Sequence, residues 1–262
     1  MDILYIYIFI AGTIFGSFFD CLANRLSNNE SIIKPRSHCD VCGHVLNWYE
    51  LIPILSYFMQ KGKCKKCKSN LSIEYLLTEV ITGILFCLSY YIFGLTINTL
   101  ISLVVVSVIV ITFISDAKYM IILDEVLVIG SLLVMGIYAI AGEYTTLLNM
   151  FIGALSLSVI MLLIKVLGDK AFKRESLGWG DVKLSMFAGL VLGVKLGVVY
   201  IFLGSVLALP YAMYITLKKK EGLLPFGPFL AAAILFIFWN MDKIEKLINI
   251  IIGVQPWRNL HF

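Results

Sequence analysis

Two carboxylates stand where apolar runs of this chain meet polar loops. Asp181 lies in the stretch GWGDVK at 178–183, a turn hinged by glycines, and Asp116 ends another apolar run in SDAK at 115–118. Two carboxylates held close together cannot both ionise, so they share a proton. Such a pair can hydrolyse a peptide bond, because the ionised acid takes a proton from water while the protonated acid donates to the scissile carbonyl. Asp116 and Asp181 are therefore candidate catalytic residues.

Each of these acids also has a purely structural interpretation. A carboxylate in a bilayer costs about 2.5–3.5 kcal/mol on insertion scales, so it usually has a function or a partner. Lys118 and Lys183 follow Asp116 and Asp181 by two residues, and the acids could pair with them as interfacial anchors. Spacing alone leaves both interpretations open.

Four of the six cysteines form two C-x-x-C pairs in the most basic stretch of the chain. The pairs are Cys39 with Cys42 and Cys64 with Cys67, and 21 residues (43–63) lie between them. This spacing is typical of zinc sites with four thiolate ligands, in which the closed ligand shell makes the metal structural. It also indicates a reducing compartment, where disulfides are rare. We therefore predict that zinc folds this region.

Other interpretations of the cysteine region stay open. The thiols could be unmetallated, and His38 and His44 flank the first pair as alternative ligands or as surface residues. The remaining cysteines, Cys21 and Cys87, are interpreted as buried small apolar groups.

The composition is that of a multi-pass membrane protein. Of the 262 residues, 60% are hydrophobic and 15% charged, the mean hydropathy is +0.93, and several apolar runs approach the roughly 20 residues that cross a bilayer. The net charge of +4 is small and concentrated in a few loops, which indicates membrane orientation signals and argues against a nucleic-acid surface. The N-terminus lacks a basic segment and a small-residue cleavage site, so its apolar run is expected to be a retained span.

The predicted fold is an all-α polytopic membrane protein with about eight transmembrane helices. A small cytosolic four-cysteine domain, resembling a zinc ribbon, is expected at 21–73, between the first span (1–20) and the other seven (74–240). The tail 241–262 carries an apolar patch at 247–252 that is too short to cross and could lie along the interface. The eight apolar runs are 3–19, 75–93, 97–115, 123–141, 147–167, 182–194, 196–217 and 225–240.

Loops that carry Lys and Arg alternate with nearly neutral loops, and such residues concentrate on the cytosolic side. Eight basic residues lie between the first two runs, whereas loops 94–96 and 142–146 have none. This pattern puts both termini outside and every basic loop in the cytosol, with Asp116 and Asp181 on the same side. The basic residues of the later loops are Lys170, Lys173, Arg174, Lys218, Lys219 and Lys220.

The sixth run is short. The chain from Asp181 to Lys195 advances 14 positions, roughly 21 Å of helix against a hydrocarbon core of about 30 Å. If Lys195 reaches the outer interface, Asp181 is recessed below the cytosolic one. A turn with two glycines is tolerated at that depth only where it lines a cavity or packs on protein. The geometry thus indicates a polar pocket in the membrane.

Other residues in the apolar runs have a structural interpretation, and one of them also has a functional interpretation. Glu79, about one turn inside the second run, is a candidate substrate contact or a hydrogen-bond partner of a neighbouring helix. Gly12 and Gly16 would let another helix approach closely. The same packing role is expected for Gly189, Gly193 and Gly197.

Taken together, these motifs resemble those of the type IV prepilin peptidases, the prepilin leader peptidase/N-methyltransferase family, over nearly the whole chain. The motif G-x-G-D alone would be weak evidence for this family, since presenilin-like proteases share it. So many short motifs in the same order are specific to the family. The matching segments are GSFFD at 16–20, RL at 25–26, SHC at 37–39, ELIPILSY at 50–57, EY at 74–75 with Glu79, SD at 115–116 with Asp124, GWGDVKL at 178–184 and PFGPFLA at 225–231.

The resemblance implies an aspartyl peptidase of the bacterial inner membrane that cuts the basic leader from prepilins and pseudopilins at the cytosolic face. The family's two catalytic acids fall on Asp116 and Asp181. Asp124 competes for the first role, but Asp116 holds the family position at the end of the preceding span. Members with the cysteine domain usually also methylate the new N-terminal amine with S-adenosylmethionine, whose binding residues the resemblance does not identify.

This chain departs from the family pattern at four positions. Asp20 stands where the family usually has Asn, and Asp40 replaces the usual Pro of the first cysteine pair. Ser27 and Leu123 also replace common prolines. None of the four is one of the candidate acids or thiolates, so peptidase activity is expected, and the change at the first cysteine pair bears on methylation.

Three rival functions compete with this interpretation. A zinc metalloprotease needs a His-rich open site such as H-E-x-x-H, and the chain has only three histidines, His38, His44 and His261. A non-enzymatic transporter or assembly protein could use the same spans and zinc domain. A peptidase without methyltransferase activity is the third. The particular prepilins, the client system (pili, secretion or DNA uptake) and the oligomeric state are left open.

Overall fold

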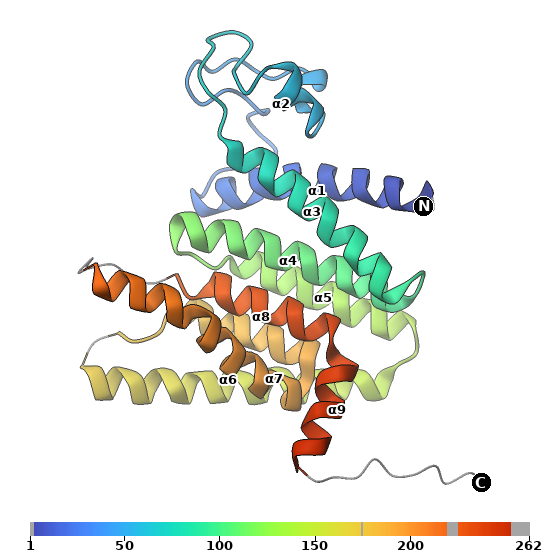
Figure 1. Ribbon diagram of the computed structural model, residues 1–262, viewed down its shortest axis with the longest axis vertical. Coiled ribbons are helices and arrows are strands. Elements are labelled where there is room, and N and C mark those ends of the chain that lie inside the picture. The colour runs from blue at the N-terminus through green and yellow to red at the C-terminus, as the bar shows by residue number, and fades with distance from the viewer. Residues whose placement is uncertain (1–2, 174, 219–224, 253–262) are drawn as a thin grey trace. The chain divides into compact units, whose positions relative to one another are not determined.

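The computed structural model describes residues 3–173, 175–218 and 225–252 (Figure 1). Their regular structure is helical, and the described residues hold isolated bridges, His38 with Val45 and Lys63 with Asn70, in place of strands. The predicted all-α class is confirmed. The chain divides into two compact units, and the boundary lies between Leu133 and Val134, inside helix α5 (Asp124–Ile140).

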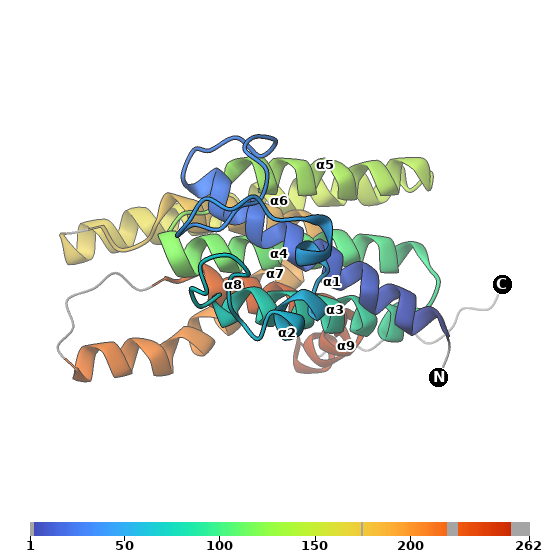
Figure 2. The same ribbon diagram turned by 90° about the horizontal axis from the view of Figure 1, so that it is seen from above.

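The first unit is built on α1 (Ile3–Ser27) and α3 (Ile73–Phe93), which lie side by side in both views (Figures 1 and 2). Glycines allow this close approach: a Cβ added to Gly16 would lie 3.0 Å from the Cα of Glu79. Gly12 plays the same part, since a Cβ there would lie 2.7 Å from the Cα of Gly83. The expected close packing at both glycines is confirmed.

Helix α4 (Ile97–Tyr119) completes the helices of this unit. Most of its apolar span is buried, and the hydroxyls of Ser102 and Ser89 join it to α3 at 2.8 Å. The four-cysteine region leaves α1 and returns to α3, and its short helices are the 3-10 helix η1 (Trp48–Leu51) and α2 (Leu55–Met59). This topology agrees with the expected extramembrane insertion between the first two spans.

The second unit contains α6 (Tyr144–Phe172), α7 (Trp179–Leu217), α8 (Gly227–Trp239) and α9 (Met241–Ile252). Two of its glycines let helices approach closely. A Cβ on Gly189 of α7 would lie 3.0 Å from the Cα of Ala154 on α6, a contact of backbone with backbone. Gly197 instead makes room for the side chain of Leu157 on α6. The packing role predicted for these glycines is confirmed.

Helix α7 folds back on itself at Gly193. This residue has φ 71° and ψ −178°, a conformation that glycine tolerates and other residues do not. The hydroxyls of Ser185 and Tyr200 lie 3.1 Å apart, whereas fifteen positions of straight helix would separate them by about 22 Å. The two halves match the separate runs 182–194 and 196–217, and Gly193 breaks the helix in addition to allowing packing.

The structure confirms a multi-pass membrane protein but not the count of eight spans. Within the described residues, five helices are long and apolar enough to cross a membrane (α1, α3, α4, α6 and α7), and α8 with α9 would make a sixth if the bent pair is one span. Helices α5 and α8 have 17 and 13 residues, about 26 and 20 Å, less than the hydrocarbon thickness of about 30 Å.

The start of the C-terminal tail is a helix that turns sharply away from its neighbour. Helix α9 makes an angle of 87° with α8, and its side chains Leu247, Ile250 and Ile251 are exposed. An amphipathic helix of this kind suits the interface, so the interfacial position stays a prediction. The rest of the tail (253–262) lies outside the described residues, as do the basic residues Arg174, Lys219 and Lys220.

Candidate active site

Asp116 lies in the last turn of α4, in the first unit. Met120 ends that helix in the left-handed conformation, with φ 56°, and donates its backbone N–H to the carbonyl of Asp116 at 3.0 Å. Asp116 is only 6% exposed. The carboxyl group is thus buried at a helix C-terminus, where the helix dipole disfavours negative charge.

Asp181 lies at the opposite kind of helix end, in the second unit. It is the third residue of α7, and its Oδ2 accepts a hydrogen bond from the backbone N–H of Gly178 at 3.3 Å. Ser185 donates its hydroxyl to the carbonyl of Asp181 at 2.8 Å, and Asp181 is 8% exposed. The turn closes on the carboxylate at a helix N-terminus, where unpaired N–H groups and the dipole favour negative charge.

A buried lysine on α6 holds the loop that leads to this turn. Lys165, 4% exposed, reaches Oε1 of Glu175 at 3.1 Å and the carbonyl of Leu177 at 2.5 Å. Its Nζ also lies 3.3 Å from Oδ2 of Asp169 and 5.3 Å from the ring centroid of Trp179. One cation therefore contacts both chain segments that flank Gly178.

Asp169, one turn further along α6, completes this support. Its Oδ1 accepts from the backbone N–H of Ser176 at 2.6 Å and from the Ser176 hydroxyl at 2.8 Å. Sequence reasoning missed Lys165 and Asp169. The available signal was an ionisable residue inside the apolar run 147–167, with an acid four positions later on the same helix face.

Lys118, which the simpler interpretation paired with Asp116, contacts two other acids. Its Nζ lies 3.5 Å from Oδ1 of Asp20 on α1 and 3.1 Å from Oε2 of Glu74 on α3. Asp20 is 1% exposed. The lysine thereby joins three helices next to the turn that carries Asp116.

The four cysteines converge. All four sulfurs lie within 4.8 Å of one another, with Cys39 and Cys67 3.8 Å apart and Cys42 and Cys64 4.0 Å apart. Four sulfurs at 2.3 Å around a tetrahedral zinc would be separated by about 3.8 Å. The residues therefore fit a zinc ion of four thiolate ligands.

The two cysteine pairs sit on equivalent turns. In the first, Cys39 N–H donates to the carbonyl of His44 at 2.9 Å, and in the second, Cys64 N–H donates to that of Ser69 at 2.8 Å. The bridges His38–Val45 and Lys63–Asn70 close them, and every pair of equivalent positions is 25 residues apart. Two tight turns of one design thus present the ligands.

Hydrogen bonds favour the thiolate form that a metal binds at Cys67 and Cys39. At Cys42 the backbone N–H of His44 also lowers the pKa, but burial and the neighbouring thiols outweigh it and raise the pKa to about 11. The Ser69 hydroxyl, 3.0 Å from the sulfur of Cys67, is the main cause that lowers the pKa of Cys67 to about 6. Backbone N–H groups of Cys42 and Val41 lower the pKa of Cys39.

The histidines that flank the first pair are occupied elsewhere. His38 Nδ1 lies 3.0 Å from the carbonyl of Arg36, and His44 Nε2 lies 3.3 Å from Oε2 of Glu50. The same Glu50 oxygen accepts from the backbone and side-chain N–H groups of Asn47, both at 2.9 Å. These bonds, chiefly that from the Asn47 backbone, lower the pKa of Glu50 and tie the first turn to η1.

Glu79 bonds both to this insertion and to a neighbouring helix. Its Oε2 accepts the backbone N–H of Ile54 at 2.7 Å. Ile54 has φ 62°, a conformation rare for a β-branched residue, so the bond holds an unusual turn at the start of α2. The Glu79 side chain also hydrogen-bonds Ser17 of α1, so the predicted bond to a neighbouring helix is present, and these contacts favour a structural role.

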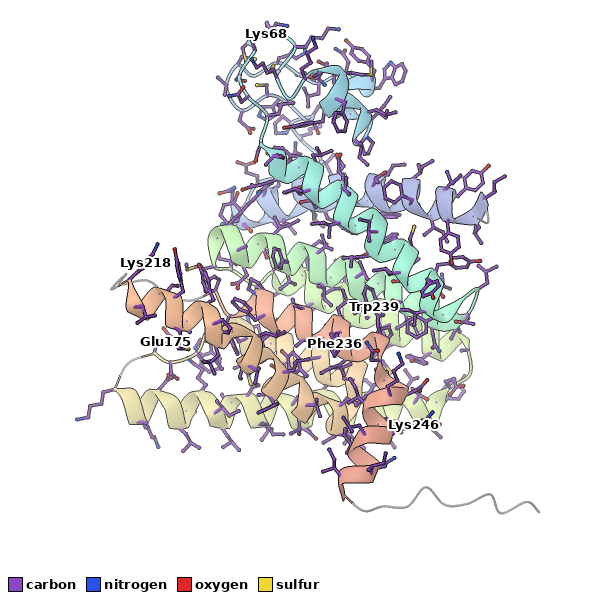
Figure 3. The ribbon with its side chains drawn as sticks, viewed as in Figure 1. Lys68, Glu175, Lys218, Phe236, Trp239 and Lys246 are labelled. Carbon is purple, nitrogen blue, oxygen red and sulfur yellow. The ribbon has the colours of Figure 1, made fainter. Side chains whose placement is uncertain are left out.

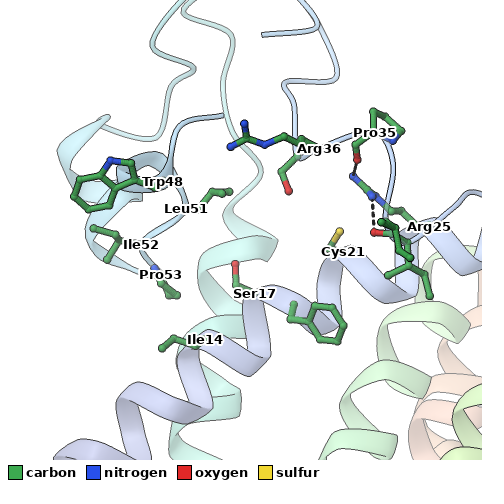
Figure 4. Close-up of a pocket in the computed structure, with 14 residues that line it drawn as sticks. Ile14, Ser17, Cys21, Arg25, Pro35, Arg36, Trp48, Leu51, Ile52 and Pro53 are labelled. Carbon is green, nitrogen blue, oxygen red and sulfur yellow. Dashed lines mark hydrogen bonds between the residues drawn. The ribbon is translucent and has the colours of Figure 1, made fainter. Parts of the chain in front are cut away.

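A cavity of about 610 Å³ opens between α1 and this insertion (Figure 4). Ser17 and Cys21 on α1 line one wall, and Trp48 and Pro53 line the other. Arg25 shapes its edge by donating to the carbonyls of the loop before the first cysteine, the shortest at 2.7 Å to Pro35. The charged residues among those that line it are Arg25 and Arg36.

Comparison with known proteins agrees with this arrangement. A family model described as "Bacterial Peptidase A24 N-terminal domain" matches residues 10–93, and one described as "Type IV leader peptidase family" matches residues 103–213. The prepilin leader peptidase/N-methyltransferase of Bacillus subtilis (strain 168) is 32% identical over 240 residues, which cover 90% of this chain and 94% of the relative.

The chain belongs to the type IV leader peptidase family.

Two further relatives carry the same printed name. The protein of Neisseria gonorrhoeae is 30% identical over 234 residues, covering 87% of this chain and 79% of its own length. The protein of Myxococcus xanthus (strain DK1622) is 34% identical over 187 residues, which cover 70% of this chain and 55% of that protein's own length. No solved structure matches. The first family model ends at Phe93, the last residue of α3, and the leader peptidase model contains both Asp116 and Asp181.

Proposed function

We propose that this protein removes the leader from type IV prepilins and pseudopilins and then methylates the new N-terminal amine. The observation that carries the proposal is the match to a prepilin leader peptidase/N-methyltransferase over 90% of the chain. That match extends through the cysteine region and both candidate acids. The transporter alternative has no observation in its favour.

Asp116 and Asp181 are the proposed catalytic residues, and their helix ends suggest which acts as acid and which as base. The N-terminus of α7 stabilises negative charge on Asp181, so this residue is the better base for removing a proton from water. The C-terminus of α4 favours a neutral Asp116, which can donate its proton to the scissile carbonyl. Lys165 is a positioning residue in this scheme, because it fixes the loop before Asp181.

Zinc is the proposed metal, held by Cys39, Cys42, Cys64 and Cys67 in a structural site. It would stabilise the fold of the insertion, as closed thiolate sites do. The methyl group would come from S-adenosylmethionine. The cavity beside α1 does not suit this molecule. Its charged lining residues are two arginines, which could pair with the cofactor's carboxylate, but no acid in the lining could hold its sulfonium and ammonium cations, so no methyl-transfer step is assigned to it.

We also propose the membrane arrangement predicted from the loops. Both termini lie outside, the cysteine insertion (21–73) is cytosolic, and the two acids face the cytosol. Eight crossings would result if α5, both halves of α7 and α8 each span with local thinning or protein cover. The folded-back shape of α7 supports counting its halves separately.

The test is leader cleavage by the purified protein in lipid vesicles. Asp116→Asn and Asp181→Asn should each slow cleavage by about 10³-fold, the range expected for a lost general acid or base, without loss of thermal stability. Asp124→Asn, at the start of α5, is the matched control and should keep cleaving. Full activity in Asp116→Asn or Asp181→Asn would remove that acid from the mechanism. Mass spectrometry of the product N-terminus tests methylation separately.

A further inference from the structure

The stretch from Trp48 to Met59 exposes an unusual amount of apolar surface for a cytosolic insertion. Trp48 is 75% exposed and Met59 74%. The stretch has one charged residue, Glu50, which is buried and hydrogen-bonded as described above. The other large apolar side chains that it exposes are Leu51, Leu55 and Phe58. A surface with this much apolar area and no exposed charge is typical of an interaction site.

The hydrogen bond from Ile54 to Glu79 shows where this surface lies along the spans. Glu79 is the seventh residue of α3, about 9 Å from the start of that helix at 1.5 Å per residue. Its Cα faces Gly16 of α1, eleven positions before the end of that helix at Ser27. The Ile54 turn therefore lies beside the paired helices α1 and α3, not beyond their ends.

The cavity lies on the same side. Figure 4 shows Ile52 and Pro53 facing the stretch of α1 that carries Ile14 and Ser17. Ile14 and its neighbour on that face, Phe18, are about half exposed, as side chains that face lipid are. The apolar wall of the cavity is thus continuous with the face of α1 that meets the bilayer.

Positively charged lysines follow immediately after the apolar stretch in the sequence. All five lysines between positions 60 and 69 are exposed, and Lys65 is held 4.7 Å above the ring of Tyr49. Basic residues next to an apolar surface suit the anionic lipids of a cytosolic leaflet, and tryptophan favours the membrane interface. The five are Lys61, Lys63, Lys65, Lys66 and Lys68.

We propose that the stretch Trp48–Met59 is inserted into the cytosolic leaflet beside α1 and α3, and that it anchors the cysteine region to anionic phospholipid. The inference rests on α1 and α3 crossing the membrane and on the proposed orientation, but not on the peptidase activity. Water is the less suitable environment, because it would leave five large apolar side chains solvated. Lys68, on the second cysteine turn, lies at the end of the region farthest from α1 and α3 (Figure 3).

The experiment measures the depth of Trp48 in the full chain. The other three tryptophans are replaced (Trp179→Phe, Trp239→Phe, Trp257→Phe), and the protein is reconstituted in vesicles of phosphatidylethanolamine and phosphatidylglycerol that contain brominated acyl chains. Trp48 should emit at short wavelength and lose more than half of its fluorescence to bromines placed near the headgroups. Bromines near the bilayer centre should quench less.

A matched control places the probe at the opposite end of the same region. Lys66→Trp in a Trp48→Phe background puts tryptophan on the second cysteine turn, two positions from Lys68, and its emission should be red-shifted and unaffected by brominated lipid. Equal quenching of both probes, or none at Trp48, overturns the proposal. Trp48 that is shielded from aqueous iodide but not quenched by lipid would mean that protein covers the surface, which also overturns it.

A second measurement needs no substitution. The native chain is reconstituted with a photoactivatable phosphatidylglycerol, irradiated, digested and mapped by mass spectrometry. Lipid adducts are expected on residues 48–59 at a frequency similar to that of the exposed face of α1, and not on residues 64–70. Adducts absent from 48–59 while α1 is labelled would reject the anchor, and leader cleavage measured on the same sample reports separately on the proposed activity.

Discussion

The cysteine region and the turn that carries Asp181 solve one problem, holding functional side chains on irregular backbone, in different ways. In the cysteine region, two short turns of the same design present four sulfurs to a common centre. The Asp181 turn has no such internal repeat, and its support comes from Lys165 and Asp169 on the preceding helix. The first region depends on local geometry and a metal, whereas the second depends on charged side chains buried between helices.

The largest difference between the two regions is expected when the metal is removed, because only the cysteine region should then lose its structure. Structural zinc contributes about 10–16 kcal/mol of apparent binding free energy in small domains, so a strong chelator, or Cys64→Ser, should unfold residues 39–70. Hydrogen exchange should rise there by orders of magnitude, while amides at 175–181 keep their protection. Equal loss of protection in both regions would show that they are coupled, and unchanged protection would show that the thiols fold without metal.

Replacing Lys165 should act on the other region. Lys165→Met leaves Glu175 and Asp169 without their cation and loosens the loop before Asp181, and a displacement of about 1 Å can cost about 100-fold in rate. We expect kcat to fall by about that factor, with little change in KM and no change in protection of residues 39–70.

The controls for this substitution lie on the same helix. Lys170→Met changes an exposed lysine of α6 and should leave kcat unchanged. Lys165→Arg keeps the cation and should restore most of the activity, which a purely space-filling role would not predict. An unaltered kcat in Lys165→Met would contradict the positioning role.

A smaller, pH-dependent effect is expected at Glu50. Its pKa is lowered in the folded protein by the Asn47 N–H groups, so its ionised form stabilises the fold above its unfolded pKa of about 4.3, and this contribution is lost as pH falls through the folded pKa. Glu50→Gln should cost about 1–2 kcal/mol at pH 7. The difference between wild type and variant, measured by denaturation at each pH, should shrink as the pH falls; a difference that does not depend on pH would argue against this origin.

The smallest effect is expected at Asp20. Asn is the usual family residue there, and Lys118 keeps Glu74 as a partner at 3.1 Å. Asp20→Asn therefore leaves no unpaired cation and removes the desolvation cost of a buried carboxylate, so the free energy of unfolding should change little. Thermal unfolding in the same lipid checks this. A loss of several kcal/mol would mean that the buried Asp20–Lys118 pair is needed to join α1 to α4.

The sequence alone identified what depends on local spacing. The two C-x-x-C pairs predicted a metal site, and the four sulfurs do converge. Apolar runs predicted the helices, because the hydrophobic thickness of a membrane fixes their length. Even the break between the runs ending at 194 and starting at 196 marked the place where α7 turns back at Gly193. The roles of Asp116 and Asp181 stay predictions, drawn from motif order.

Tertiary structure decided the partners of ionisable groups. One interpretation of the sequence paired Lys118 with Asp116, and the structure shows that Lys118 contacts Asp20 and Glu74 from two other helices. Glu79 bonds to Ile54, 25 positions earlier, and Lys165 reaches Leu177 across a helix end. A long polar side chain can bond to any group that the packing brings within reach, and in a low-dielectric interior it must find one. Spacing along the chain therefore determines the helices and the cysteine turns, whereas the buried charges are matched only when the helices pack.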